Sequence, residues 1–387
     1  MISVVSYTHL GYQKDKKSLP TYRIVKGLLR EGKIENIYVL DYEDTYGIDT
    51  NVLEAPIPGG KFVPRLLYLV ENLPFTPDAR TTSAQLLDHF TSKQIGNEEI
   101  VLSFPPFSKT LEVAKSNGST CIVYAGGAHP NHYRSLLQEE IDKYADELTT
   151  ESTGIASRSK THEQSYELAD YIYYLSDYAK ETFVKNGIAP GKLVKAGPLS
   201  AEVDKYNDSD HSGDDFNVLC LTDITLLKGV QYLLQAWNQL TLPDAKLTIC
   251  GSMDDPSEEL LLPKIRKLDD VIYEGHVDDP KRYYSKASIL VHPSLTEGFS
   301  KVIAEGMASS LPVVITEHCQ REFIEYEGFV VPIRDPSAIA EKIEYFYHNR
   351  DEVERRGRAA RRKIKNNTWN DFSNRIIERT IELEDTR

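Results

Sequence analysis

Residues 288–315 read SILVHPSLTEGFSKVIAEGMASSLPVVI, which predicts a strand, a loop, a helix and a second strand. The apolar run Ile289–Val291 is typical of a strand buried in a parallel sheet, and a proline ends it. Gly298 permits a sharp turn whose backbone can approach a ligand closely. Ser300 suits the N-cap of the following helix, so we expect the amides of Phe299 and Ser300 to be unpaired donors. The stretch therefore predicts a seat for a phosphate group.

Two glutamates flank this predicted helix N-terminus. Glu297 lies in the loop, and Glu305 lies at the margin of the helix face that Val302, Ile303 and Met307 form at a 3.6-residue period. In a nucleotide sugar seated on the phosphate site, Glu297 would lie near the sugar and Glu305 near the ribose. Each glutamate alone could equally be an acid favoured by the helix dipole or a solvated residue.

The spacing Glu297-x7-Glu305, inside a Pro-Ser-x-x-Glu-Gly-Phe sequence, resembles the signature of the retaining GT-B glycosyltransferases of family 4, also called group 1. The resemblance covers most of residues 217–369, together with residues 169–172 and the surroundings of His129. It implies a GT-B fold, in which two doubly wound, Rossmann-like parallel-sheet α/β domains face each other across a cleft. It also implies a nucleotide-sugar donor and no requirement for a metal.

Strand-like apolar runs alternate with helical stretches along the chain, which is typical of doubly wound parallel sheets. The predicted strands are residues 2–6, 37–40, 100–104, 121–124, 171–175, 217–221, 246–250, 271–273, 288–291, 313–316 and 329–332. Residues 198–215 are rich in Pro, Ser, Asn, Asp and Gly, which indicates a linker. We therefore predict an acceptor-side N-terminal domain at 1–203, a linker at 204–215, a donor-binding C-terminal domain at 216–370 and, from the resemblance, a helix at 371–387 that returns to the N-terminal domain.

Lys228 and Gly229 follow the first strand of the second domain. A lysine at such a turn can reach a diphosphate as a point charge, although a lysine in a turn is usually a solvated surface residue. The resemblance places Lys228 against the donor diphosphate. The family often has an arginine five residues earlier, where this chain has Asp223, and an acid beside a diphosphate is electrostatically unfavourable. Asp223 therefore points away, is compensated by another cation, or weakens donor binding.

Gly11 and Gly251 each follow a predicted strand, and there the backbone could approach the diphosphate and the nucleotide base, respectively. His129 follows the fourth strand of the first domain, on the edge that faces the cleft, and related enzymes carry a histidine there. Its imidazole could bind the donor sugar or stabilise charge at the reacting carbon, or it could merely cap a helix. The catalytic candidates are His129 and Glu297, and the donor-binding candidates are Gly11, Lys228, Gly251, Gly298, Phe299, Ser300 and Glu305.

We expect no metal and no cofactor, because the nucleotide sugar is the substrate. The sequence Asp208-Ser209-Asp210 has the Asp-x-Asp pattern that holds a divalent metal in another glycosyltransferase architecture, but no apolar strand leads into it. We interpret it as solvated linker. His132 could pair with His129 on a metal, but no third ligand is visible in the sequence.

The net charge of −14, from 45 basic and 59 acidic residues, does not favour nucleic acid as a partner. No apolar run has the length of a membrane span, and the N-terminus becomes polar too soon for a signal peptide, so we expect a cytoplasmic protein. The basic segment 14–33 could bind an anionic acceptor, or the inner face of a membrane that carries a lipid-linked acceptor. A solvated helix face is the alternative.

The sequence thus predicts an enzyme of glycan biosynthesis, a retaining, metal-independent glycosyltransferase of the hexosyltransferase type. Its donor would be a nucleotide diphosphate sugar, and its acceptor a glycan, a lipid-linked molecule or a small molecule. Two alternatives keep the fold. One is a catalytically weakened nucleotide- or partner-binding protein, motivated by Asp223. The other is a nucleotide-sugar epimerase, for which no acid and base pair is evident, or a phosphorylase, which would need a lysine-bound pyridoxal cofactor.

Overall fold

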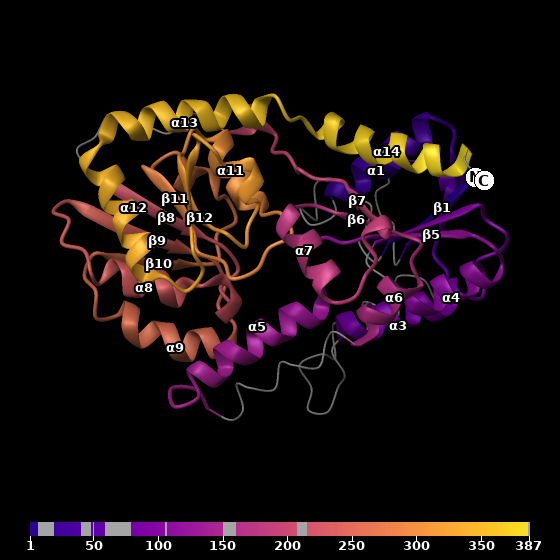
Figure 1. The fold of residues 1–387 in the computed structure, drawn as a ribbon, viewed down its shortest axis with the longest axis horizontal. Helices are drawn as coiled ribbons and strands as arrows, with labels where there is room; N and C mark the ends of the chain where they lie inside the picture. The colour runs from indigo at the N-terminus through magenta and orange to yellow at the C-terminus, as the bar shows by residue number, and fades with distance from the viewer. Residues whose placement is uncertain are drawn as a thin grey trace.

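The computed structural model describes residues 1–6, 19–39, 48, 50–58, 79–104, 107–149, 160–206 and 215–385. These residues form two parallel sheets, each flanked by helices (Figure 1). The seven-stranded sheet has the order β3-β2-β1-β4-β5-β6-β7, and the six-stranded sheet has the order β10-β9-β8-β11-β12-β13. The order reverses between β1 and β4 and between β8 and β11, where open parallel sheets bind ligands. The predicted class of two doubly wound, Rossmann-like domains is confirmed.

The N-terminal sheet is built from strands β1 (Ile2–Ser6), β2 (Ile34–Val39), β3 (Leu53–Glu54), β4 (Ile100–Phe104), β5 (Thr120–Tyr124), β6 (Tyr171–Tyr174) and β7 (Leu193–Lys195). Its helices are α1 (Leu19–Arg30), α3 (Ala79–Thr91), α4 (Ser108–Ser116), α5 (Pro130–Lys143), α6 (Lys160–Leu168) and α7 (Asp177–Lys185). The central strands β1 and β4 are buried at every position, as continuous apolar runs with helices on both faces require.

The C-terminal sheet is built from strands β8 (Phe216–Leu221), β9 (Ala245–Cys250), β10 (Val271–Gly275), β11 (Ile289–His292), β12 (Val313–Thr316) and β13 (Gly328–Val331). Its helices are α8 (Val230–Trp237), α9 (Asp255–Ile265), α10 (Lys281–Tyr284), α11 (Lys301–Ala308), α12 (Pro336–His348) and α13 (Arg350–Lys365), and α14 (Trp369–Asp385) follows. Every predicted strand is present, with its ends within a few residues of the expected positions. Strands β3 and β7 were not predicted, because neither contains an apolar run.

Helix α14 lies against α1 of the N-terminal sheet, beyond the end of α13 (Figure 1). A Cβ atom at Gly27 would lie 2.0 Å from Cδ1 of Ile377, so the two helices cross where α1 has no side chain. Tyr173 and Thr380 share a buried hydrogen bond of 2.8 Å between α14 and strand β6. The last helix is therefore part of the N-terminal core, while the exact domain boundaries stay predictions.

Helix α5 belongs by topology to the N-terminal sheet, yet its second half is buried in the C-terminal core. Leu136, Leu137 and Ile141 pack in the same apolar cluster as Leu227 and Leu233. One helix therefore joins the two sheets, with its first turn near the end of β5 and its last turns against the segment around α8.

Candidate functional site

The end of β11 and the turn after β8 bring the central side chains of the site together, where the strand order reverses. Lys228 ends the short helical turn Leu226–Lys228 after β8, and Glu297 lies in the loop between β11 and α11. Gly229 closes the turn with φ of 70°, and a Cβ atom there would lie 2.0 Å from the carbonyl oxygen of Pro293. The turn therefore needs glycine both for its backbone angle and for its contact with the loop after β11.

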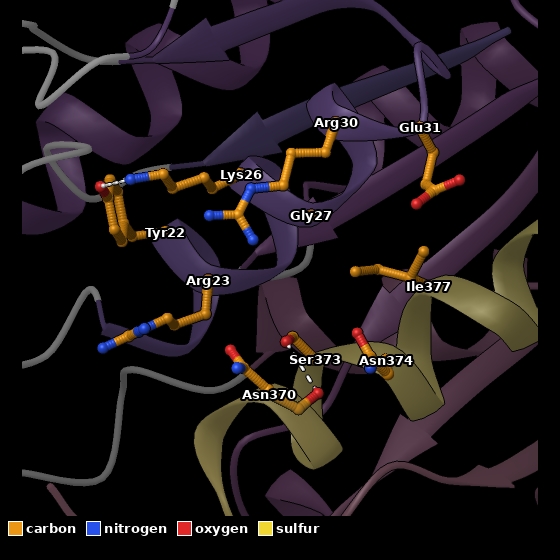
Figure 2. A pocket seen from close by; sticks show the side chains of 10 residues that line it. All are labelled: Tyr22, Arg23, Lys26, Gly27, Arg30, Glu31, Asn370, Ser373, Asn374 and Ile377. Atoms are coloured by element: carbon orange, nitrogen blue, oxygen red, sulfur yellow. Dashed lines mark hydrogen bonds between the residues drawn. The ribbon is translucent and has the colours of Figure 1, made fainter.

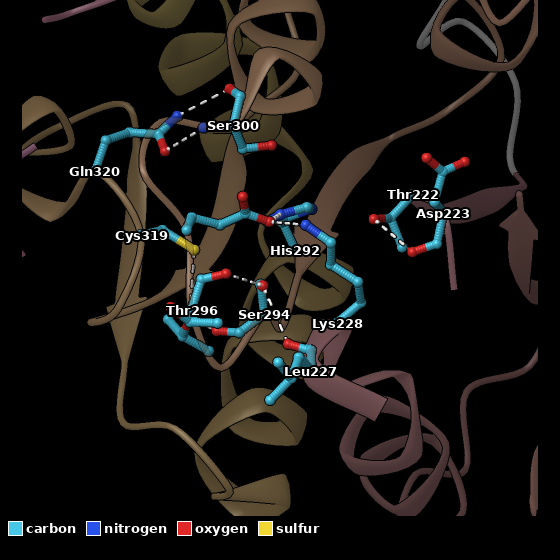
Figure 3. A network of polar contacts seen from close by, with 12 residues as sticks. Thr222, Asp223, Leu227, Lys228, His292, Ser294, Thr296, Ser300, Cys319 and Gln320 are labelled. Carbon is cyan, nitrogen blue, oxygen red and sulfur yellow. Dashed lines mark hydrogen bonds and ion pairs between the residues drawn. The ribbon is translucent and has the colours of Figure 1, made fainter. Parts of the chain in front are cut away.

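Glu297 is the acceptor of two buried or half-buried donors (Figure 3). Lys228 Nζ forms an ion pair with its Oε1 oxygen, and His292 Nε2 lies 2.9 Å from the same oxygen. Burial favours the neutral carboxyl, but the charge of Lys228 and the bond from His292 outweigh it, so the pKa of Glu297 lies well below its ordinary value. Burial alone would lower the pKa of Lys228, yet the charge of Glu297 raises it overall. The pair is therefore ionised at neutral pH.

His292 was not among the predicted site residues. It is 1% exposed, and its Nε2 faces Glu297. Nδ1 is buried and has no hydrogen-bond partner among the described residues. The available signal was a polar residue at the end of an apolar strand, five positions before Glu297.

The predicted phosphate seat is partly filled by the protein itself. Ser300 is the N-cap residue of α11, but its amide donates to Gln320 Oε1 at 3.0 Å, and Gln320 Nε2 donates back to its carbonyl at 3.1 Å. The prediction that the Ser300 amide is an unpaired donor was wrong, because a side chain after β12 occupies it. The side chain of Phe299 is buried against Phe323, with ring centroids 5.7 Å apart.

Gly298 approaches another chain segment rather than open space. A Cβ atom there would lie 2.1 Å from the carbonyl oxygen of Gly126 and 2.8 Å from Cα of Gly127. These two glycines follow β5 of the N-terminal sheet, so the loop that carries Glu297 touches the opposite domain. The expected close approach of the Gly298 backbone exists, and its described partner is this glycine pair.

Glu305 lies half-buried on α11 beside two tyrosines. The hydroxyl of Tyr284 donates to its Oε2 oxygen at 3.1 Å. Burial and then the charge of Glu305 raise the pKa of Tyr206 and of Tyr284. The carboxylate of Glu305 therefore stays close to phenol groups that keep their protons, on the same helix as the phosphate seat and one turn beyond it.

Gly251 directly follows β9 with φ of 139°, and a Cβ atom there would lie 1.6 Å from the carbonyl oxygen of Thr222. The segment that approaches Gly251 closely is thus the backbone at Thr222, directly after β8. Whether Gly251 also borders a nucleotide base stays a prediction. Gly11 lies outside the described residues, as do Asp208 and Asp210.

His129 caps helix α5. Its Nδ1 accepts from the amide of Asn131 at 3.2 Å, and its ring packs against the rings of Tyr166 and Phe183, with centroids 6.1 and 5.3 Å away. Burial lowers the pKa of His129 to about 4. The imidazole is therefore neutral, and Nε2 carries its proton. The helix-capping alternative is realised, and a contact with the sugar through Nε2 stays a prediction.

A chain of polar contacts from the N-terminal domain reaches the loop beside Glu297. The hydroxyl of Tyr178 donates to Thr296 Oγ1 at 3.1 Å and lies 3.0 Å from His132 Nε2. Its ring stacks on His318, with centroids 4.3 Å apart. None of these residues was predicted to act in the site, because they meet only when the two domains fold against each other.

Comparison with known proteins fits this geometry. Residues 215–349 match the family model for glycosyl transferases group 1. Over these residues the chain is similar to the group 1 glycosyltransferases. It is 29% identical over 220 residues to the capsular polysaccharide biosynthesis glycosyltransferase CapM of Staphylococcus aureus, covering 54% of this chain and 56% of CapM. It is 34% identical over 169 residues to an uncharacterized glycosyltransferase of Methanocaldococcus jannaschii, covering 42% and 43% of the two chains.

Solved glycosyltransferases share the whole fold. The sucrose-phosphate synthase of Thermosynechococcus elongatus superposes with a TM-score of 0.67 at 16% identity, covering 100% of this chain and 99% of that one. HepE of Anabaena, in complex with UDP and glucose, gives 0.65 at 13% identity, covering 98% and 99%. These likenesses show that the chain has the GT-B fold. The sequence matches to the two curated relatives span about half of each relative's length.

Asp223 stands where the group 1 motif often has an arginine. It is exposed, and Figure 3 shows its carboxylate turned away from the Lys228 side chain. This orientation is one of the three possibilities for Asp223, and its effect on donor binding stays a prediction. Within the part of the chain that the structure describes, no group of three His, Cys, Asp or Glu residues could hold a metal ion, and no helix is long and apolar enough to cross a membrane.

Proposed function

We propose that this chain transfers a sugar from a nucleotide diphosphate sugar to a carbohydrate or lipid-linked acceptor, with retention of anomeric configuration and without a metal ion. The observation that supports the proposal best is the half-buried ion pair of Lys228 and Glu297 where the strand order reverses. A half-buried cation held beside the phosphate seat can stabilise the charge that develops on a departing diphosphate.

The ion pair with Glu297 suits Lys228 for stabilising a departing diphosphate. Since Glu297 holds the Lys228 ammonium, the cation is oriented before a donor enters, and less reorganisation is needed during the reaction. In the donor complex we expect Lys228 to contact the diphosphate, Glu297 the sugar hydroxyls and Glu305 the ribose. His129 would donate from Nε2 to the sugar, since its Nδ1 is occupied by the helix cap.

Two named neighbours motivate the substrate classes. HepE is solved with UDP and glucose, and CapM is named for capsular polysaccharide biosynthesis. We therefore infer a uridine-type donor as the first to test and a glycan or lipid-linked acceptor, reached from the cytoplasmic side with peripheral membrane contact through the basic segment 14–33. No cofactor is part of the proposal.

A binding protein without activity is the second candidate, and Asp223 was the reason for considering it. Because Asp223 is exposed and turned away, it does not oppose a diphosphate at Lys228. The active enzyme is therefore the better account of the site.

The test begins with thermal unfolding of the purified chain against nucleotide diphosphates and nucleotide sugars. A ligand that binds only the folded state stabilises it by about 2.7 kcal/mol at a hundred times its dissociation constant. We expect one nucleotide to raise the melting temperature, with the shift reduced in Glu305→Gln and kept in Glu344→Gln, a matched change at an exposed position of α12.

The activity arm incubates the chain with that nucleotide sugar and follows release of the nucleotide diphosphate, with and without EDTA. The anomeric configuration of the released or transferred sugar is read by NMR. Retention and insensitivity to EDTA are expected. A binding shift with no release under any acceptor mixture favours the binding protein, and loss of release with EDTA contradicts the metal-independent mechanism.

A further inference from the structure

A second concave surface lies between helices α1 and α14, and it shares no residue with the nucleotide site. Its volume is about 530 Å³, and α1 forms one wall while α14 forms the other (Figure 2). The two helices cross closely at Gly27 and Ile377, and both residues line the groove. A volume of this size lies within the range of small-molecule sites, roughly 300 to 1,000 Å³.

The α1 wall is strongly basic. Arg23, Lys26 and Arg30 line it at intervals of three and four residues, so successive turns of one helix face present them together, and Glu31 is the acid among the lining residues. Figure 2 shows the Arg30 guanidinium extending toward the α14 wall. This cationic wall lies in a chain whose overall charge is −14, so it is a local feature.

Lys26 and Arg30 differ from Arg23 in their partners among the described residues. Lys26 Nζ donates to the neutral hydroxyl of Tyr22 at 3.0 Å, and within the described ranges no carboxylate pairs with Lys26 or Arg30. Arg23 pairs with Glu202 at 3.1 Å, but Glu202 also pairs with Lys205. Burial, and to a lesser extent the charge of Arg30, lower the pKa of Arg23, as expected where cations face one another.

The opposite wall supplies neutral polar groups. Asn370 and Asn374 are exposed and lie one turn apart on α14, so both amides can donate to hydroxyl or phosphate oxygens. The Ser373 hydroxyl between them is used internally, because it donates to the carbonyls of Trp369 and Asn370. A cationic wall that faces amides fits a ligand with an anionic end and a hydroxyl-rich end.

We propose that this groove binds a small phosphate-bearing molecule, with the phosphate on Arg23, Lys26 and Arg30 and the remainder against Asn370 and Asn374. Arginine favours phosphate because its planar guanidinium donates two parallel hydrogen bonds. The phosphate can belong to a soluble sugar phosphate or to the headgroup of a lipid. The lipid form of this proposal rests on the membrane contact that the proposed function gives to segment 14–33, which contains Arg23, Lys26 and Arg30, while none of the groove residues belongs to the nucleotide site.

The experiment is isothermal titration calorimetry of the full chain at low ionic strength, with glucose 6-phosphate, inorganic phosphate and glucose as probes. We expect saturable binding of glucose 6-phosphate, weaker binding of phosphate and none of glucose. The variants Arg30→Gln and Lys26→Gln should each weaken binding at least tenfold. Arg362→Gln, at an exposed position on α13, is the matched control and should change it less than twofold.

A second arm uses co-sedimentation with vesicles of phosphatidylglycerol and of phosphatidylcholine. If glucose 6-phosphate does not bind but the chain sediments with the anionic vesicles and Arg30→Gln does not, the phosphate is that of a lipid headgroup. Binding of glucose 6-phosphate assigns a soluble ligand. Lys228→Gln should leave either interaction unchanged.

The proposal is overturned by three outcomes. These are the absence of binding to both phosphate sources, binding that persists in Arg30→Gln and Lys26→Gln, and binding that is lost in Lys228→Gln, which would place the phosphate in the nucleotide site. Melting temperatures of the variants confirm that each is folded.

Discussion

Replacing Glu140 with alanine should destabilise the protein far more than the same change at its neighbour Glu139. Both carboxylates pair with Arg334, Glu140 at 2.6 Å through Nε and Glu139 at 2.8 Å through Nη1. Glu140 is fully buried, however, and it also accepts from Tyr232 at 2.9 Å and from Gln231 at 2.8 Å. The Glu139 side chain is 52% exposed.

The magnitudes follow from that difference in burial. Glu140→Ala removes the buried acceptor that Arg334, Tyr232 and Gln231 share, and removing the buried partner of an ion pair costs about 3 to 5 kcal/mol. Glu139→Ala removes an exposed ion pair, which contributes at most about 1 kcal/mol. For a chain of 387 residues that unfolds in one transition, these losses correspond to melting-temperature decreases of roughly 4 to 6 °C and about 1 °C.

The assay is differential scanning calorimetry of the two variants and of Glu140→Gln. The glutamine keeps the volume and an acceptor oxygen, so its decrease should lie between those of the two alanine variants. Equal decreases for Glu139→Ala and Glu140→Ala would refute the reasoning, because burial would then not decide the strength of the interaction. A decrease below about 1 °C for Glu140→Ala would also refute it.

Two further predictions concern the site. Burial lowers the pKa of His129 from an ordinary 6.5 to about 4, so the unfolded chain takes up the proton at a higher pH than the folded chain does. The free energy of unfolding should therefore decrease as the pH drops from about 6.5 to 4, by up to about 3 kcal/mol. His129→Asn keeps a capping acceptor and should lose less stability over that range in urea unfolding; an equal loss contradicts the assignment. Gly298→Ala places a methyl group 2.1 Å from the Gly126 carbonyl of the other domain and should widen the domain separation seen by X-ray scattering, whereas Gly96→Ala, whose nearest contact is 3.9 Å, should not; an unchanged profile contradicts the contact.

The strands could be predicted because each central strand is a continuous apolar run, such as IVLSF over β4, that only a sheet covered on both faces can bury. The short edge strands β3 and β7 carry no such pattern, since they depend on pairing with a neighbour that is already in place. Motif positions after neighbouring strands predicted that Lys228 and Glu297 lie in one site, but they did not predict the ion pair between them. The roles of Gln320 and Tyr178 did not, because each depends on a contact between segments 20 and 118 residues apart in the sequence.

Helix α5 connects the two halves of the site in a way that the sequence periodicity alone does not reveal. Its first turn is capped by His129 and begins beside the glycines that touch Gly298, while its buried Glu140 is held by donors of the C-terminal domain. A separation of the domains that keeps the bonds of Glu140 must carry α5 along with the C-terminal domain. The chain would then have to bend near Gly126 and Gly127, where no side chains restrict the backbone. The proposed donor site and the interdomain contact share helix α5, so we predict that Glu140→Ala alters nucleotide binding as well as stability.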